Sequence, residues 1–161
     1  MDIKIVEYKD LDDNITNEII NDFINVNMNY FLGREFKRRE DIINIENYYI
    51  KNGGNFWVAI DKKHNIIVGT IAVEVKDGKG VLKRFYVDKD YHNKGIGTEL
   101  YKTFEKYVIE NTNVRILYLS CGKVLKDTHR FYENRGWKQI DTLEIEITTH
   151  KEIVDYFKKV L

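Results

Sequence analysis

The sequence predicts a mixed α/β (α+β) fold, with a largely antiparallel central sheet and flanking helices. Two changes in the spacing of apolar residues support this class. Apolar residues first recur at helical spacing, then gather in short, strand-like runs, and return to helical spacing after Gly95 and Gly97. The expected element order is therefore β-α-α-β-β-β-α-β-α-β-β, in which one strand–helix–strand unit interrupts an antiparallel meander.

The first third of the chain is expected to form one strand and two helices. Residues 3–8 alternate between apolar and polar and indicate a strand. Residues 15–31 carry apolar side chains at helical spacing, which predicts an amphipathic helix that ends at Gly33. A second helix is expected between Ile42 and Tyr49.

The middle of the chain predicts three consecutive strands. Residues 56–60 form a short apolar run, and residues 66–75 are rich in β-branched side chains. The pair Asp77-Gly78 is a strong hairpin signal, and residues 81–87 continue as the next strand. Consecutive strands joined this way are expected to pair antiparallel.

The last third is expected to contain two helices and three strands. A helix follows the two glycines, a strand covers residues 114–121, and a short helix stops at Gly136. The tail, residues 138–147 and 152–160, is most simply a hairpin. The segment 153–157 is compatible with a helix as well, and the pattern alone leaves both open.

Composition limits the class of protein. The 161 residues fit a single domain over residues 1–161. Lys and Arg number 26 and Asp and Glu number 26, a balance that argues against a nucleic-acid partner and gives no polybasic membrane signal. With one cysteine, no signal-peptide pattern and no apolar run of membrane length, the chain is expected to be cytoplasmic.

Residues 82–100 read as a strand, a polar turn, two glycines and a helix start, which suits a phosphate group. A helix N-terminus leaves about four N–H groups unpaired at the positive end of its dipole. Gly95 and Gly97 let a bulky anion approach the backbone, and Lys94 adds a positive charge. A tight turn without a ligand explains the glycines equally well. A Rossmann fingerprint is excluded because Leu100 replaces its third glycine, and no P-loop pattern is present.

Two motifs resemble those of the GNAT N-acetyltransferase superfamily. Residues 92–97, His-Asn-Lys-Gly-Ile-Gly, are similar to its motif A, [QR]-x-x-G-x-[GA], with a histidine in the first position. Residues 129–137 resemble its motif B, φ-Y-x-x-x-G-[FW], although Lys126 and Thr128 stand where members often carry Asn and Ala. Residues 66–75 are similar to the family's third strand. The resemblance covers nearly the whole chain in the correct element order.

This resemblance implies that an acetyl group passes from acetyl-CoA, without a metal, to a primary amine of a small molecule or protein. The amine attacks directly in a ternary complex. Backbone groups of Phe85 and Val87 are expected to meet the pantetheine arm, and an N–H near Val87 to stabilise the oxyanion. The N–H groups of residues 93–98 would hold the pyrophosphate. The expected cofactor-binding residues are Phe85, Tyr86, Val87, His92, Asn93, Lys94, Gly95, Ile96, Gly97 and Thr98.

Two catalytic roles are expected. By resemblance, Tyr132 donates a proton to the departing thiolate; simple packing on an apolar helix face is the alternative. Neutralising a lysine-like amine at pH 7 costs roughly 4.6 kcal/mol, so a proton acceptor is useful. Glu74 is the first candidate for that base, against the plainer interpretation of an exposed strand carboxylate. Glu144, Glu146 and water relays come next.

The acceptor site is expected between the first two helices, where the family usually builds it. Tyr30, Phe31, Arg34 and Glu35 fall there, and they either contact substrate or pack and cap the helix. The sequence does not identify the amine, which could belong to a polyamine, an aminoglycoside, an amino acid or a protein. A homodimer through an edge strand or the tail hairpin is compatible with this architecture.

Thiol and metal chemistry are not expected. Cys121 ends a predicted buried strand and is interpreted as a core residue rather than an acyl-enzyme nucleophile. His64, His129 and His150 have no partners at metal-ligand spacing. Two other functions stay open: a non-catalytic acyl-CoA-binding or sensing domain, and an interaction module with a GNAT-like fold. Amine-dependent release of free CoA separates an enzyme from a sensor.

Overall fold

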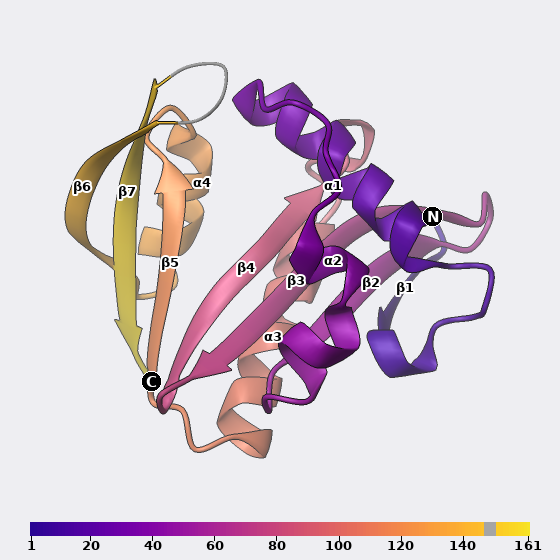
Figure 1. The fold of residues 1–161 in the computed structure, drawn as a ribbon, viewed down its shortest axis with the longest axis horizontal. Helices are drawn as coiled ribbons and strands as arrows, with labels where there is room; N and C mark the ends of the chain where they lie inside the picture. The colour runs from indigo at the N-terminus through magenta and orange to yellow at the C-terminus, as the bar shows by residue number, and fades with distance from the viewer. Residues whose placement is uncertain (147–150) are drawn as a thin grey trace.

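The computed structural model describes the backbone of residues 1–146 and 151–161, and the side chains outside residues 143–152. Its strands form one seven-stranded sheet in the order β1-β2-β3-β4-β5-β7-β6 (Figure 1). The strands are β1 (Ile3–Glu7), β2 (Asn55–Asp61), β3 (Ile66–Lys76), β4 (Lys79–Val87), β5 (Ile116–Gly122), β6 (Lys138–Glu146) and β7 (Lys151–Val160). The helices are α1 (Asn17–Leu32), α2 (Glu40–Ile43), α3 (Ile96–Asn111) and α4 (Lys126–Glu133).

The predicted mixed α/β class and element order are confirmed. Every neighbouring pair in the sheet is antiparallel except β4 and β5, which are parallel and joined by α3. The segment 153–157, for which a helix stayed open, lies in β7, where it pairs with β5 on one side and β6 on the other. Val154 and Phe157 are 5% and 1% exposed on opposite faces of the strand, so pairing on both edges and cover on both faces favour the strand.

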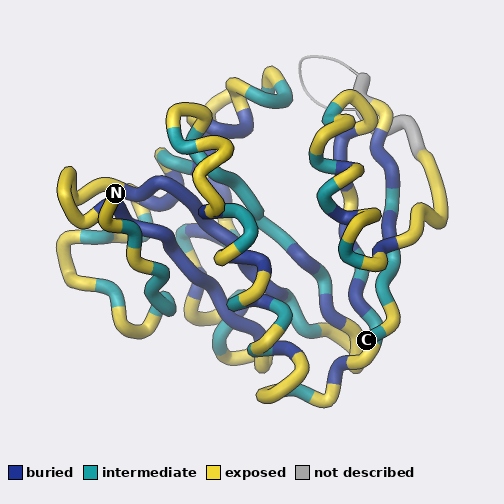
Figure 2. Tube along the Cα trace, turned by 180° about the vertical axis from the view of Figure 1, so that it is seen from behind, coloured by how far each residue is buried: buried dark blue, intermediate teal, exposed yellow. Residues whose placement is uncertain are grey.

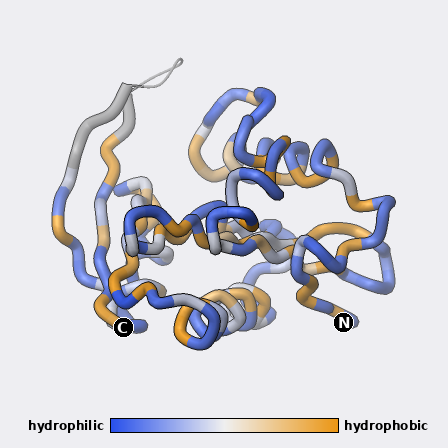
Figure 3. The backbone as a smooth tube through the Cα atoms, turned by 60° about the horizontal axis from the view of Figure 1, so that its bottom comes forward, coloured by the Kyte–Doolittle hydropathy of each residue, from blue (hydrophilic) through white to orange (hydrophobic). Residues whose placement is uncertain are grey.

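The helices cover both faces of the sheet. In Figure 3 the strands lie between α1 and α2 on one side and α3 on the other. Ile20 and Ile24 of α1 are fully buried against one face, and Leu100 and Phe104 of α3 against the other. Figure 2 shows the central strands buried along most of their length. The sheet therefore forms a rigid platform between two apolar layers.

The second predicted helix is interrupted. The chain forms the single turn α2, and after it the short π-helix η2 (Glu46–Ile50). Asn44 lies at the break, and its side chain donates a hydrogen bond to the carbonyl of Glu40 at 3.0 Å. Such a side chain competes with the helical hydrogen bonds of the backbone. Tyr49 then turns inward and is fully buried.

Strands β4 and β5 diverge from one end. Their pairing comprises only Gly80 with Leu117 and Val81 with Tyr118. At Gly80 the strands are so close that an added Cβ would lie 2.7 Å from Leu117 Cδ2. From there β4 and β5 spread apart, as Figure 1 shows. The remaining edge of β4 is therefore open toward β5.

Candidate functional site

The loop between β4 and α3 has the backbone that its glycines predicted. Gly95 caps α3 in the left-handed conformation (φ +83°), and Asn93 is left-handed as well (φ +61°). A Cβ on Gly95 would meet nothing within 4 Å, so the backbone angle rather than space favours glycine there. A Cβ on Gly97 would lie 3.7 Å from Val87 and 3.8 Å from Phe85. Gly97 therefore keeps open the space between α3 and β4.

A cavity of about 410 Å³ lies over this helix start, and we call it the glycine-loop cavity. It collects residues from β4, the loop, the first turn of α3 and the helix α4. Its walls fit a pyrophosphate, because unpaired N–H groups at a helix start bind anions. Gly95 and Gly97 have no side chains that would fill the space. It is lined by Phe85, Val87, Tyr91, His92, Asn93, Gly95, Ile96, Gly97, Thr98, Asp127, Thr128 and Phe131.

Eight of the ten expected cofactor-binding residues line this cavity. The two exceptions are Tyr86, which lines the neighbouring cavity, and Lys94, which lines neither. These eight residues lie together because a loop of consecutive residues stays together whatever the rest of the fold does, and their role in binding a cofactor stays a prediction.

His92 has an additional role within the protein. Its Nε2 lies 2.7 Å from the carbonyl oxygen of Val87, and its ring stacks on Phe31 of α1 at a centroid distance of 5.4 Å and an angle of 6°. It therefore ties the glycine loop to the end of β4 and to α1. The histidine that departs from the family motif is a structural clamp as well as a lining residue.

A β-bulge shapes the open edge of β4. Thr70 of β3 pairs with Tyr86 of β4, and Ala72 pairs with Lys83. One residue of β3, between Thr70 and Ala72, therefore faces two residues of β4, Arg84 and Phe85. Arg84 is left-handed (φ +53°), and its carbonyl accepts a hydrogen bond from Thr70 Oγ1 at 2.7 Å. The bulge changes the direction of β4 just before the glycine loop.

A second cavity, which we call the central cavity, fills the opening between β4 and β5 and also measures about 410 Å³. It shares Phe85, Val87, His92 and Thr128 with the glycine-loop cavity, so the two meet at the end of β4. Its other walls come from α1, the loop after it, β4, β5, α4 and β7. They are Met28, Leu32, Phe31, Arg34, Leu82, Lys83, Arg84, Tyr86, Ser120, Cys121, Gly122, Leu125, Tyr132, Val154 and Tyr156.

Tyr132 lines the central cavity and is only 4% exposed. Burial, and then the nearby Cys121, raise the pKa of Tyr132 well above its ordinary value. The phenol therefore keeps its proton at neutral pH and can donate it. Cys121 is buried beside it on the same wall, and its Sγ contacts the carbonyl of Gly122 at 3.7 Å.

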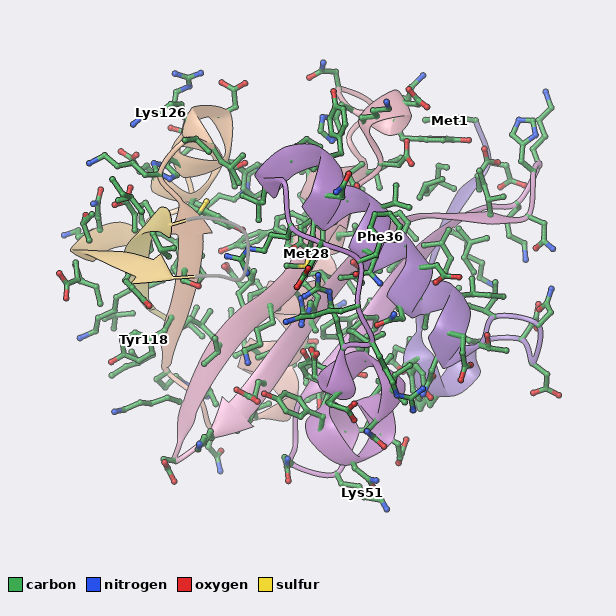
Figure 4. All side chains as sticks on the ribbon, turned by 45° about the horizontal axis from the view of Figure 1, so that its top comes forward. Met1, Met28, Phe36, Lys51, Tyr118 and Lys126 are labelled. Carbon is green, nitrogen blue, oxygen red and sulfur yellow. The ribbon has the colours of Figure 1, made fainter. Side chains whose placement is uncertain are left out.

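Sequence reasoning missed an ion pair behind the central cavity. Arg84 donates two hydrogen bonds to Asp41, at 3.0 and 2.8 Å, and Tyr49 donates a third at 2.6 Å. Burial alone would raise the pKa of Asp41, but the hydrogen bond and charge of Arg84 outweigh it and hold the pKa below its usual value. Arg84 also contacts Met28 Sδ at 3.3 Å, and Figure 4 labels Met28 on α1 above β4. The available signal was the pair of basic residues, Lys83 and Arg84, in the middle of the predicted strand 81–87.

The expected acceptor residues divide into two groups. Phe31 and Arg34 line the central cavity. Tyr30 is 57% exposed on the outer side of α1, where Lys89 Nζ lies 4.5 Å from its ring centre. Glu35 is exposed, and its backbone carbonyl oxygen accepts a hydrogen bond from Arg39 Nη2 at 3.2 Å.

Glu74, the first candidate for the base, lines neither cavity. It pairs with Val81 in the β3–β4 register, near the closed end of the strands, and its carboxylate is 3.3 Å from Lys83 Nζ. The geometry therefore adds no support to Glu74 as a base, and the assignment stays a prediction. The side chains of Glu144 and Glu146, like residue His150, lie outside the described residues.

The remaining histidines and the helices complete the description. His129 is buried, with Nε2 3.1 Å from the carbonyl of Gly122 and 3.7 Å from Asp155. Within the residues that the structure describes, no three His, Cys, Asp or Glu side chains gather in a way that could hold a metal ion. In the same part of the chain, no helix is both long and apolar enough to cross a membrane.

Comparison with known proteins gives consistent matches. Residues 20–137 match the model of the Acetyltransferase (GNAT) family. An N-acetylaspartate synthetase of Xenopus tropicalis is 32% identical over 112 residues, which are 68% of this chain and 40% of that protein. The chain thus spans about two fifths of this relative's length.

Solved structures agree in fold. A GNAT-family acetyltransferase of Staphylococcus aureus superposes with a TM-score of 0.81 at 28% identity, covering 99% of both chains. An acetyltransferase of Bacillus anthracis in complex with acetyl coenzyme A superposes with a TM-score of 0.59 at 20% identity, covering 72% of this chain and 67% of the other.

Proposed function

This chain belongs to the GNAT acetyltransferase family, and from that premise we propose that it transfers the acetyl group of acetyl-CoA to a primary amine. The observation that carries the proposal is the junction of two cavities at the end of β4. One has the anion-binding backbone of a helix start, and the other holds a buried phenol. The relative named N-acetylaspartate synthetase and a structural neighbour with bound acetyl coenzyme A support the same assignment.

In this proposal the glycine-loop cavity binds the pyrophosphate of acetyl-CoA. N–H groups of residues 93–98 hold its oxygens, and Gly97 gives them room beside Val87 and Phe85. The open edge of β4 then offers backbone groups to the pantetheine arm as the arm runs toward the central cavity. The thioester is thereby brought to the junction, where Val87 and Tyr132 lie within reach of the same space.

The amine would enter through the central cavity and attack the thioester carbonyl directly. Holding both reactants in adjoining cavities supplies much of the rate. A backbone N–H near Val87 stabilises the negative charge that develops on the carbonyl oxygen. Tyr132 gives its proton to the sulfur as the C–S bond breaks, and the amine's proton leaves through a base or water. The acceptor is a small-molecule or protein amine, and we propose that residues 1–161 act as a single domain.

The test compares two glycines with the same backbone. Gly95 (φ +83°) and Gly78 (φ +74°) are both left-handed with open space around them. Replacing either by Glu is expected to cost about 1–2 kcal/mol of stability, but only Gly95→Glu places a carboxylate at the pyrophosphate site. Calorimetry should show acetyl-CoA binding to the natural chain and to Gly78→Glu, and none to Gly95→Glu.

Transfer is measured separately, as amine-dependent release of free CoA. Acetyl-CoA binding without release for any primary amine would leave the sensing domain as the function. Equal binding by both glycine variants would remove the loop from the cofactor site, and with it this proposal.

A further inference from the structure

The open edge of β4 ends in a residue whose backbone carbonyl is held by a side chain. Asp88 donates its N–H to the carbonyl of Val68 on β3 at 2.9 Å. Successive residues of an antiparallel strand direct their backbone groups to opposite edges, so the N–H and C=O of Val87 point toward the opening between β4 and β5. His92 Nε2 lies 2.7 Å from this carbonyl oxygen. Val87 therefore offers its N–H at the open edge, while His92 holds its carbonyl in place.

The contact with Val87 depends on a hydrogen-bond donor. A carbonyl oxygen only accepts, so the ring nitrogen that faces it carries the proton, and His92 is the Nε2–H tautomer. A glutamine side chain also has an N–H donor, and the family motif has glutamine or arginine at this position. A phenylalanine has none. The bond to Val87 therefore needs a donor and does not need an aromatic ring.

The flat face of His92 makes a separate contact. Its ring lies nearly parallel to that of Phe31, at a centroid distance of 5.4 Å and an angle of 6°. Phe31 is in the last turn of α1 and lines the central cavity, where the acceptor would bind. This contact needs an aromatic ring and no donor. His92 thus meets the cofactor strand through one ring nitrogen and the acceptor wall through its face.

Other contacts hold the two segments that His92 joins. Helix α1 is anchored by Ile20 and Ile24, which are fully buried. The loop before the glycines is anchored by Tyr91, whose hydroxyl donates a hydrogen bond to Asp61 at 2.6 Å. His92 itself is exposed. A change of its side chain is therefore expected to shift a wall of the site and to leave the chain folded.

We propose that His92 is a positioning residue for both substrates, through two separable contacts. Its Nε2–H fixes the end of β4 for the pantetheine arm, and its ring fixes Phe31 as a wall of the acceptor site. His92 lines both cavities, so it lies where the two substrates meet. The inference rests on the proposed function.

One substitution removes only the donor. His92→Phe keeps an aromatic ring, and it should raise the Kd of acetyl-CoA by about 2- to 10-fold, the range of one net hydrogen bond. The KM for the amine should not change. 3′-Phospho-ADP, which has the diphosphate but no pantetheine arm, should bind this variant and the natural chain equally. Calorimetry measures both affinities, and steady-state release of CoA measures the KM.

A second substitution removes only the ring. His92→Gln should raise the KM for the amine by about 2- to 10-fold, the range of one aromatic pair, and leave the Kd of acetyl-CoA unchanged. The amine is the fastest acceptor among spermidine, kanamycin, L-lysine and a lysine-containing peptide. His64→Phe and His64→Gln are the matched controls, because His64 is exposed and lines neither cavity.

The opposite effects of the two variants carry the test. Two variants that change the same constant, or neither constant, would overturn the inference, because the two contacts would then not serve different substrates. His92→Phe that weakens 3′-phospho-ADP as much as acetyl-CoA would overturn it too, since the glycine loop itself would have moved.

Hydrogen exchange of the ligand-free protein keeps this inference apart from the proposed function. His92→Gln should speed exchange in the last turn of α1. His92→Phe should speed exchange of the Asp88 N–H, which shares a peptide group with the Val87 carbonyl. If none of the four amines is acetylated, the proposed function fails. The inference fails instead when both variants change exchange at the same segment or at neither.

Discussion

At the scale of single residues, burial rather than identity sets the chemistry of Tyr132. An exposed tyrosine loses its proton near pH 10, whereas Tyr132 is 4% exposed and its pKa is raised well above the ordinary value. It therefore stays protonated over the whole pH range in which the protein is expected to work. A protonated donor beside the thioester lowers the barrier for loss of a thiolate, whose conjugate acid has a pKa near 8.5.

We expect Tyr132→Phe to lower kcat by about 10- to 100-fold, because it removes only the proton donor. Acetyl-CoA affinity should not change, since the glycine loop is untouched. Tyr118→Phe is the control; Tyr118 lies on β5 and lines neither cavity. Steady-state kinetics and calorimetry measure the two quantities. Full retention of kcat would leave Tyr132 with packing as its sole role.

The pH dependence of the same reaction follows from the direction of the pKa. Because the pKa of Tyr132 is raised, its deprotonation should not reduce kcat below about pH 10. A kcat profile for the natural chain from pH 6 to 9.5 measures this. Loss of rate with a midpoint near pH 8 that Tyr132→Phe abolishes would contradict the assignment.

At the scale of elements, the pair of Asp41 and Arg84 joins α2 to β4. Both side chains are mostly buried, at 12% and 20% exposed. The pair holds Arg84 at the bulge and so fixes the wall of the central cavity. Removing one partner of such a pair leaves the other buried and unpaired, which costs more than the pair itself contributes.

We expect Asp41→Asn to reduce stability at pH 7 by about 2 kcal/mol or more. Asp41 has a lowered pKa in the folded chain, so its contribution is present above the unfolded value near 4 and is lost as the pH falls through the folded value. The difference between natural chain and variant should therefore shrink at pH 3. Urea unfolding at both pH values measures it, with exposed Asp13→Asn as control. A difference that is constant with pH would mean that the charge of Asp41 is not its source.

The elements also show why some of the site could be predicted and some could not. The glycine loop is local, so the spacing of Gly95 and Gly97 was enough to locate it. The bulge at Arg84 depends on which residue of β3 faces it, and register is not visible in one strand's sequence. Asp41 and Arg84 are 43 positions apart, and only the packing of α2 on β4 brings them together. Tertiary contacts of this kind carry no signal in local spacing.

At the scale of the whole molecule, β1–β4 and β5–β7 form two parts of one sheet that are paired at one end only. One apolar cluster crosses this junction, since it includes Trp57 and Val73 from the first part and Leu119 and Phe157 from the second. The glycine-loop cavity has walls from β4 in the first part and from α4, the helix that connects β5 to β6 in the second. A ligand in that cavity therefore touches both parts.

We expect the chain to unfold in a single transition that acetyl-CoA shifts as a whole. At about 100 times its Kd, acetyl-CoA should raise the unfolding free energy by about 2.7 kcal/mol. Hydrogen exchange should then show equal added protection for the slowest amides of β3 and β5, because a shared core makes both open only by global unfolding. Two transitions in urea, or protection of β3 alone, would show that the open end of the sheet separates two folding units. Equal protection would instead mean that the junction between β4 and β5 couples cofactor binding to the stability of the entire sheet. The opening between these strands would then leave the unfolding of the sheet fully cooperative.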